Sequence, residues 1–340
     1  MRCLRFAALL CFACVAAVQS VHATDAPKLN LITTIPLPAI TGGDFDHFAV
    51  DLAHSKLYVA AEKYGSIETF SLPDGRHMES NRSVAVSPHK IELIKDGQAL
   101  MIADAGAARL EIVDTKSMTV EKRISLRPQP DSGILDARTG IFYVGNGGVR
   151  SGKDYAYFSM VSTQSESLLG RIRVPAGQIK GMAIDRRTRR LLVNFRDKNA
   201  VGIIDTETNK LVGTWSIPGP SRNSAMTLDA EHRRLFIGSR QPGKLYVLNV
   251  DTGKIVQTLD ITDISDEMAV DPAHASVYVA GEGGLDVIRR QHDGSYTKVQ
   301  HIDTYGGKTF AFVPEYHRLY VVHTKGPLAS TAGLQIFDTH

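Results

Sequence analysis

A thirteen-residue phrase recurs along the chain and limits its fold more than any other feature. FAVDLAHSKLYVA at 48–60 returns as MAVDPAHASVYVA at 268–280, and five weaker copies begin at residues 91, 133, 182, 226 and 310. The fourth residues of the seven copies are Asp51, Ile94, Asp136, Asp185, Asp229, Asp271 and Val313, spaced 42 to 49 residues apart. A period of this length indicates a repeat architecture.

Each repeat has the pattern of four antiparallel strands. An alternating segment such as FAVD, a polar turn and a β-rich run such as KLYVA predict a hairpin. A third strand follows in segments such as LEIVD, and a turn such as DTETNK leads to a fourth strand such as VGTWSI. Four strands per repeat describe one blade of a β-propeller, so we predict an all-β fold, a seven-bladed β-propeller.

The two chain ends predict how the ring closes. The seventh copy stops at its third strand, LQIFDTH, whereas LNLITTIPL at 29–37 has the alternation of a fourth strand and no repeat of its own. Without a fourth strand, the seventh sheet would keep an open edge. We therefore expect residues 29–37 to join the last blade, within a single domain that covers residues 24–340.

Residues 1–23 have the features of a signal peptide. Arg2 and Arg5 precede the apolar run AALLCFACVAAV, and small residues lead to a cleavage site after Ala23. The run is too short to span a bilayer. All three cysteines lie before the cleavage site, so we expect no disulfide in the mature chain. The sequence predicts an exported protein, periplasmic or secreted, with no membrane span.

The charge balance argues against nucleic acid as a partner. The whole chain has a formal net charge of +3, and removal of Arg2 and Arg5 with the signal peptide leaves the mature chain close to neutral. A nearly neutral chain has no electrostatic attraction for a polyanion. We expect a monomer that binds a small molecule or another exported protein.

Four copies of the phrase carry a family resemblance. The tetrapeptides YVAA at 58–61, YVGN at 143–146, YVAG at 278–281 and YVVH at 320–323 each stand about ten residues before an apolar strand. This pattern resembles the YVTN-repeat β-propellers, including the exported YncE-like proteins, and it covers residues 29–340. The resemblance implies a seven-bladed exported propeller, in a family whose members are mostly binding proteins or of unknown role.

Candidate binding residues come from the loops around one end of the propeller channel. The connection into each first strand shares a face with the loop between the second and third strands, and propeller function usually lies on this face. Five residues before the anchors stand residues that differ in charge from blade to blade, which suggests an individually specified site. The predicted ligand-binding residues are Asp46, His47, His89, Asp131, Lys180, Arg196, Arg222, Asn223, Arg240, Asp266, Glu267 and Lys308.

Two interpretations of these charges stay open. Blades four and five supply the cations Lys180, Arg196, Arg222 and Arg240, and forked guanidinium donors suit a carboxylate or phosphate. Blade six supplies Asp263, Asp266, Glu267 and Glu282, which these cations could neutralise instead. The first interpretation predicts a small anionic ligand, and the second predicts ion pairs that serve the structure.

Metal and catalytic motifs are weak in this chain. DFDH at 44–47, together with His89, could bind a divalent cation, but no spaced ligand motif is present and we assign no metal site and no other cofactor. No GxSxG or HExxH motif occurs, so we assign no catalytic residue. His54, His232 and His274 recur three residues after their anchors, which indicates a role in the turns.

The sequence therefore favours an exported binding protein with a small anion or a protein partner at its channel mouth. A hydrolase or lactonase-like enzyme that acts on a small lactone or related anion, and a protein-interaction scaffold, remain as alternatives. Whether the protein is an enzyme stays open, with binding preferred.

The signal peptide can be tested by intact-mass analysis. We expect protein recovered from the exported fraction to begin at Thr24, and we expect Leu10→Arg, which places a charge in the apolar run, to leave the chain uncut and inside the cell. Exported protein that still carries residues 1–23 would contradict this prediction.

Overall fold

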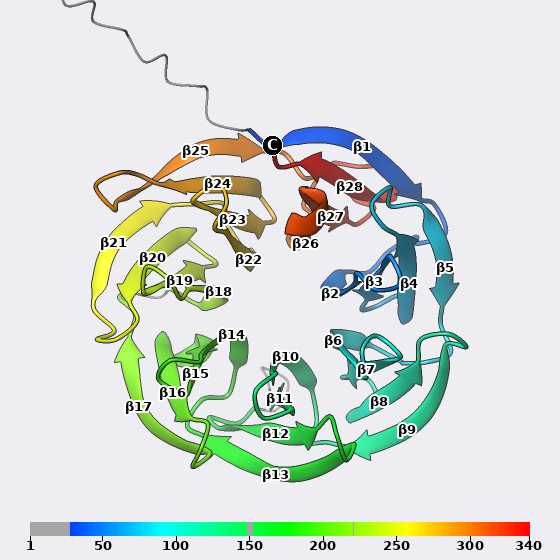
Figure 1. Cartoon of the computed structure of the whole chain (residues 1–340), viewed down its shortest axis with the longest axis horizontal. Coiled ribbons are helices and arrows are strands. Elements are labelled where there is room, and N and C mark those ends of the chain that lie inside the picture. The colour runs from blue at the N-terminus through cyan, green and yellow to red at the C-terminus, as the bar shows by residue number, and fades with distance from the viewer. Residues whose placement is uncertain (1–27, 148–151, 220) are drawn as a thin grey trace, which may run out of the picture.

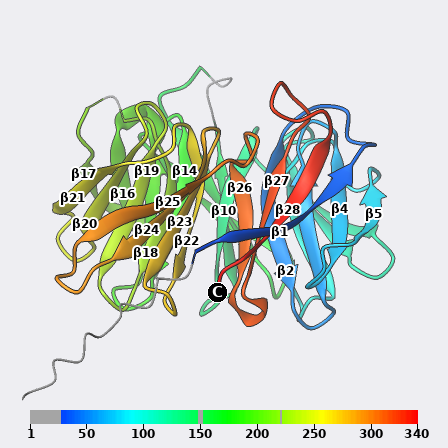
Figure 2. The same ribbon diagram turned by 90° about the horizontal axis from the view of Figure 1, so that it is seen from above.

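The computed structural model describes residues 28–147, 152–219 and 221–340, which form seven four-stranded antiparallel sheets arranged as a ring (Figure 1). This arrangement confirms the predicted all-β, seven-bladed propeller. In the view from the side, the strands of the blades run between the two faces of the ring (Figure 2). The predicted signal peptide, residues 1–23, lies outside the described residues. Among the residues that are described, no helix is long and apolar enough to cross a membrane.

The blades are numbered along the chain, and in each of the first four the strands follow one another from the inside of the ring to the outside. Blade one contains β2 (Phe45–Asp51), β3 (Lys56–Ala61), β4 (Ser66–Ser71) and β5 (His77–Asn81). Blade two contains β6 (Pro88–Ile94), β7 (Ala99–Asp104), β8 (Arg109–Asp114) and β9 (Thr119–Ser125). Blade three contains β10 (Pro130–Asp136), β11 (Ile141–Asn146), β12 (Ala156–Ser162) and β13 (Ser167–Val174). Blade four contains β14 (Ile179–Asp185), β15 (Arg190–Phe195), β16 (Ala200–Asp205) and β17 (Lys210–Ser216).

The last three blades have the same order of strands from inside to outside. Blade five contains β18 (Asn223–Asp229), β19 (Arg234–Ser239), β20 (Lys244–Asn249) and β21 (Ile255–Asp260). Blade six contains β22 (Ser265–Asp271), β23 (Ser276–Gly281), β24 (Gly284–Arg290) and β25 (Tyr296–Ile302). Blade seven contains β26 (Thr309–Val313), β27 (Arg318–His323), β28 (Ala332–Asp338) and β1 (Asn30–Leu37). Short 3₁₀ turns occur at Arg196–Lys198 and Pro314–Tyr316.

Apolar clusters between neighbouring blades form the core. One cluster joins Leu57 and Phe70 of blade one to Tyr320 of blade seven, all fully buried, and six further clusters join the other six pairs of neighbours. Consecutive side chains of a strand point to opposite faces of the sheet. Thus Leu57 packs against blade seven, while Tyr58 packs against blade two. This requirement on both faces explains why the second strand of each repeat is a continuous apolar run.

The anchors of the sequence repeat are the last residues of the seven innermost strands, where each chain turns into its second strand. The carboxylate of Asp51 accepts a hydrogen bond from the backbone N–H of His54 at 3.0 Å and lies 2.8 Å from the His54 imidazole. Asp229 with His232, and Asp271 with His274, repeat this arrangement. The predicted role of the recurring histidines in the turns is confirmed.

The ring closes by pairing strands from the two ends of the described chain. Strand β1 runs antiparallel to β28, with Asn30 opposite Asp338 and Leu37 opposite Ala332, and Figure 1 shows the blue β1 outside the red β28. The backbone of Leu29 also exchanges two hydrogen bonds of 2.9 Å with the side chain of Gln300 in blade six. The predicted completion of blade seven by residues 29–37 is therefore confirmed.

Loss of this closure should cost stability. We expect a chain that begins at residue 38 to aggregate or to melt roughly 10 °C or more below the mature protein, because β28 becomes an exposed edge and the core between blades one and seven opens. A chain that begins at residue 28 keeps β1 and is the matched control. Differential scanning calorimetry that gives all three the same melting temperature would contradict the role of β1.

Candidate functional site

Irregular pairing in the inner strands determines which side chains face the channel mouth. In six blades the register between the first and second strands shifts near the start of the first strand, for example between Phe45 and Phe48 of β2 and between Pro88 and Ile91 of β6. Such bulges redirect side chains and are frequent beside functional sites. The residues within the shifts include the predicted binding residues Asp46, His89, Asp131, Lys180 and Asp266, and Ser224 at the equivalent position of blade five. In blade seven the predicted residue Lys308 stands directly before β26.

These seven residues, called the mouth ring below, all line one cavity of about 500 Å³, the mouth cavity. Further along the inner strands its walls become apolar, with Phe48, Met182, Met226 and Phe312. A second cavity of about 350 Å³, the side cavity, shares His89, Asp131 and Lys180 with the first and adds Arg196. A small polar molecule therefore has both volume and polar partners at this end of the channel.

Opposite charges alternate around the mouth ring. His89 Nδ1 lies 2.7 Å from Asp46 and 3.6 Å from Asp131. The next pair, Lys180 and Asp131, forms a direct hydrogen bond. On the other side of the ring, Ser224 donates to Asp266 of the neighbouring blade at 2.9 Å. Lys308 lies 4.0 Å from Asp266 and 2.6 Å from Asp44. Each charged residue of the mouth ring thus pairs with a residue of opposite charge on a neighbouring blade.

The ring shifts the acidities of its members. Burial by itself lowers the pKa of His89, but the hydrogen bond to Asp46 and the surrounding carboxylates raise it to about 9. Burial also disfavours the charged form of Asp46, yet His47 and His89 hold the pKa of this carboxyl well below its ordinary value. The result is an ionised pair, a protonated imidazole beside a carboxylate.

A second link crosses blade seven. His47 Nδ1 of blade one lies 3.2 Å from Glu267 of blade six, and Thr309 of blade seven donates to the backbone carbonyl of Asp46 at 3.0 Å. Burial lowers the pKa of His47, but Asp46 and Glu267 outweigh it and raise the pKa above its usual value. These contacts join blades six, seven and one at the mouth, in addition to the pairing of β1 with β28 at the outside of the ring.

Arg196 is the most enclosed cation of the site. It follows β15 directly, in a loop braced by Asp197, whose carboxylate accepts hydrogen bonds from the backbone N–H groups of Gly177 and Gln178 at 3.0 Å. Its side chain is 10% exposed, bonds to the Ser224 hydroxyl and lies 3.8 Å from Asp266. The Nε of Arg196 is buried and has no hydrogen-bond partner among the described residues.

One carboxylate serves two guanidinium groups here. Arg240 donates to Oδ1 of Asp266 at 3.1 Å, and Arg196 lies 3.8 Å from the same oxygen. Burial lowers the pKa of Arg196 to about 10, against the opposing charge of Asp266. Blades four and five therefore keep an excess of positive charge even after blade six has contributed Asp266.

Two predicted site residues lie away from the cavities. Arg222 is exposed, and its backbone N–H binds the Asn199 side chain at 3.0 Å. Asn223 is fully buried and donates to Asn194 and to the carbonyl of Ala200, which joins blades four and five. Neither residue is among those that line the mouth cavity or the side cavity. The remaining ten predicted residues line one cavity or both.

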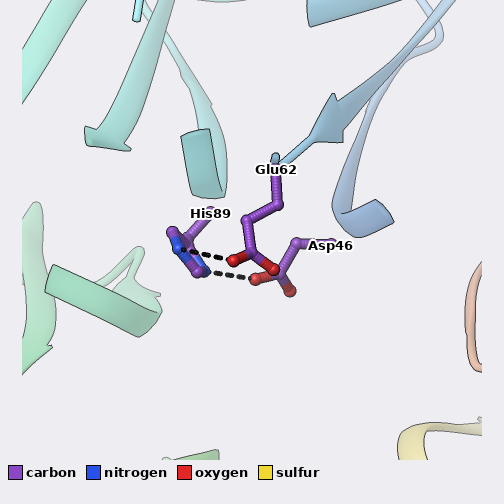
Figure 3. A group of neighbouring side chains, drawn as sticks. All are labelled: Asp46, Glu62 and His89. Carbon is purple, nitrogen blue, oxygen red and sulfur yellow. Dashed lines mark hydrogen bonds and ion pairs between the residues drawn. The ribbon is translucent and has the colours of Figure 1, made fainter. Parts of the chain in front are cut away.

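Sequence reasoning did not select Glu62, which the structure places beside Asp46 and His89 (Figure 3). Glu62 Oε1 lies 3.7 Å from His89 Nε2. Burial, together with the charges of Asp46 and Asp44, raises the pKa of Glu62. The repeat could have revealed it, because Glu62 stands eleven residues after its anchor, as Arg196 and Arg240 do after theirs.

Comparisons with known proteins support the fold. No protein family and no curated protein matches this chain. Among solved structures, the chain is similar to a chain in the "Crystal Structure of Mitotic Checkpoint Complex", with a TM-score of 0.73, 15% sequence identity, and coverage of 98% of this chain and 99% of the other. At this identity the similarity shows the propeller fold alone.

The ionised pair of His89 and Asp46 predicts a pH-dependent stability. Because folding raises the pKa of His89 from 6.5 to about 9, the pair stabilises the protein fully below about pH 6.5 and loses its effect as the pH rises through 9. In urea denaturation with chelator present, we expect the advantage of the native protein over His89→Gln to shrink across this interval. His292→Gln, in an exposed turn, is the control. An advantage that stays constant or grows with pH would contradict the prediction.

Proposed function

We propose that this protein is a binding propeller that holds a small anion at its channel mouth. The residues that carry the proposal are Arg196, Arg240, Lys180 and Ser224, all in the walls of the mouth cavity or the side cavity. Carboxylate and phosphate groups fit this set, because a guanidinium can offer two parallel donors to two oxygens.

The single observation behind the proposal is the state of Arg196. Its side chain is nine-tenths buried, its Nε has no partner among the described residues, and its nearest carboxylate is 3.8 Å away and shared with Arg240. A buried donor without a partner is costly, and a bound oxyanion would supply the missing acceptor. Ion pairing within the protein accounts for Lys180, which Asp131 holds, but it leaves Arg196 incompletely neutralised.

We further propose that the protein acts after export, as a member of or close to the YVTN-repeat propellers. The support is the signal-like segment at residues 1–23 and the four YV tetrapeptides, now seen as parts of second strands facing the blade interfaces. The binding role agrees with the fold, since propellers present loops from many blades around one mouth.

Anion binding can be measured by calorimetry and thermal shift with inorganic phosphate and succinate as probes. A ligand at a hundred times its Kd adds about 2.7 kcal/mol to stability, so we expect a clear rise in melting temperature. Arg196→Lys keeps the charge but removes the fork and the Nε donor. We expect this variant to weaken the Kd at least about tenfold, because a hydrogen bond to a charged group contributes about 1.5–3 kcal/mol.

The matched control is Arg222→Ala, which removes a positive charge from the same face without touching either cavity. We expect its Kd to stay within about twofold of the native value, since an exposed charge outside the site is screened by salt. Absence of binding by both probes, or equal weakening by Arg196→Lys and Arg222→Ala, would refute the proposal.

The two alternatives predict other outcomes. A lactonase-like hydrolase would turn over a small lactone and lose that activity when a mouth residue is replaced. A scaffold would bind another exported protein in a stable complex that phosphate and succinate do not displace.

A further inference from the structure

Three side chains of types that bind metal ions converge on the acidic side of the mouth (Figure 3). Asp46 lies in β2, Glu62 follows β3, and His89 lies in β6, so two neighbouring blades contribute. Each offers one ligand atom, and these atoms all lie within 4.8 Å of one another.

We propose that Asp46, Glu62 and His89 bind a divalent transition-metal ion. One imidazole nitrogen with two carboxylate oxygens is a donor set that suits Zn²⁺ or Mn²⁺, whereas Ca²⁺ and Mg²⁺ are usually surrounded by oxygen alone. None of its three ligands is among the residues that carry the anion proposal, so metal binding and anion binding can be tested separately.

The distance between Glu62 and His89 is close to that of a bound state. Ligand atoms about 2.1 Å from a tetrahedral ion stand roughly 3.4 Å apart. Glu62 Oε1 and His89 Nε2 are already 3.7 Å apart, which is close to this separation. Asp46 instead contacts the other ring nitrogen, Nδ1, at 2.7 Å, so binding through Nε2 requires the Asp46 side chain to leave Nδ1 and turn to the ion.

An outer partner for the imidazole is also in place. A metal-bound histidine usually donates its other ring N–H to a carboxylate, which orients the ring. Asp131 Oδ1 lies 3.6 Å from His89 Nδ1, and Lys180 holds Asp131 from its other side. Asp131 is thus the next acceptor for the Nδ1–H when Nε2 coordinates the ion and Asp46 has left Nδ1.

Burial and charge favour a cation over an empty cluster. The side chains of Asp46, Glu62 and His89 are 22%, 23% and 13% exposed, so water screens their charges only partly. The two carboxylates repel each other in this partly enclosed space, and a divalent ion between them would offset both charges. Because Glu62 and His89 line both cavities, remaining coordination positions would face the space where a small molecule enters.

The test is calorimetric titration of the purified protein, first freed of metal by chelator, with Zn²⁺, Mn²⁺ and Ca²⁺. We expect one site per chain for Zn²⁺ or Mn²⁺, with Ca²⁺ weaker. Glu62→Gln should weaken the Kd of the better ion at least about tenfold. X-ray absorption of the Zn²⁺-loaded protein should show one imidazole ligand, which is lost in His89→Gln.

The matched control is Glu282→Gln, which removes a carboxylate from the equivalent position of blade six, 3.7 Å from Lys308. It should bind the ion as the native protein does. Circular dichroism checks that each variant is folded. Glu62 lies beyond hydrogen-bond distance of His89, so Glu62→Gln should leave the contacts among the mouth-ring residues intact. Lack of binding, tighter binding of Ca²⁺ than of Zn²⁺, unchanged affinity in Glu62→Gln, or a spectrum without imidazole would each overturn the proposal.

Discussion

Apolar packing between neighbouring blades is the interaction on which the rest of the structure depends. Each sheet must bury both faces, as Leu57 and Tyr58 show by contacting opposite neighbours, so no blade has a complete core by itself. The ring satisfies this requirement only when it is closed, and β1 closes it by covering β28 from the other end of the chain. The closure strand therefore affects every site that depends on the ring geometry, including the mouth.

Closure of the ring also explains why polar and charged side chains lie together at one place. Seven inner strands start around one axis, so equivalent repeat positions from residues 46 to 308 meet at the mouth, although they are far apart in sequence. Bulges in six of these strands aim polar side chains at the cavity, whereas the following residues return to apolar packing. The scaffold is repetitive, and the side chains placed on it differ from blade to blade.

Charge in this partly enclosed space is distributed unevenly. Lys180 with Asp131 and His89 with Asp46 form balanced pairs. Arg196 remains under-neutralised on blades four and five, and Glu62 is the excess acid on blades one and two. Both of these residues line the side cavity, so the proposed cation site and the proposed anion site face the same space. Unbalanced buried charge is more informative about ligands than the balanced pairs, because the pairs already satisfy one another.

The sequence by itself determined the fold, since a period of about 42 residues with four strand patterns leaves few arrangements other than a closed propeller. It also determined the mouth ring, because counting from the anchors selects equivalent positions. Only the tertiary structure decided which of the other residues near the mouth belong to the cavities. Asn223 turned inward to join two blades, Arg222 turned outward, and Glu62 came within 3.7 Å of His89 from a different blade. Repeat counting gives the place of a residue along its strand, but side-chain direction and contacts between blades depend on bulges and packing that are set in three dimensions.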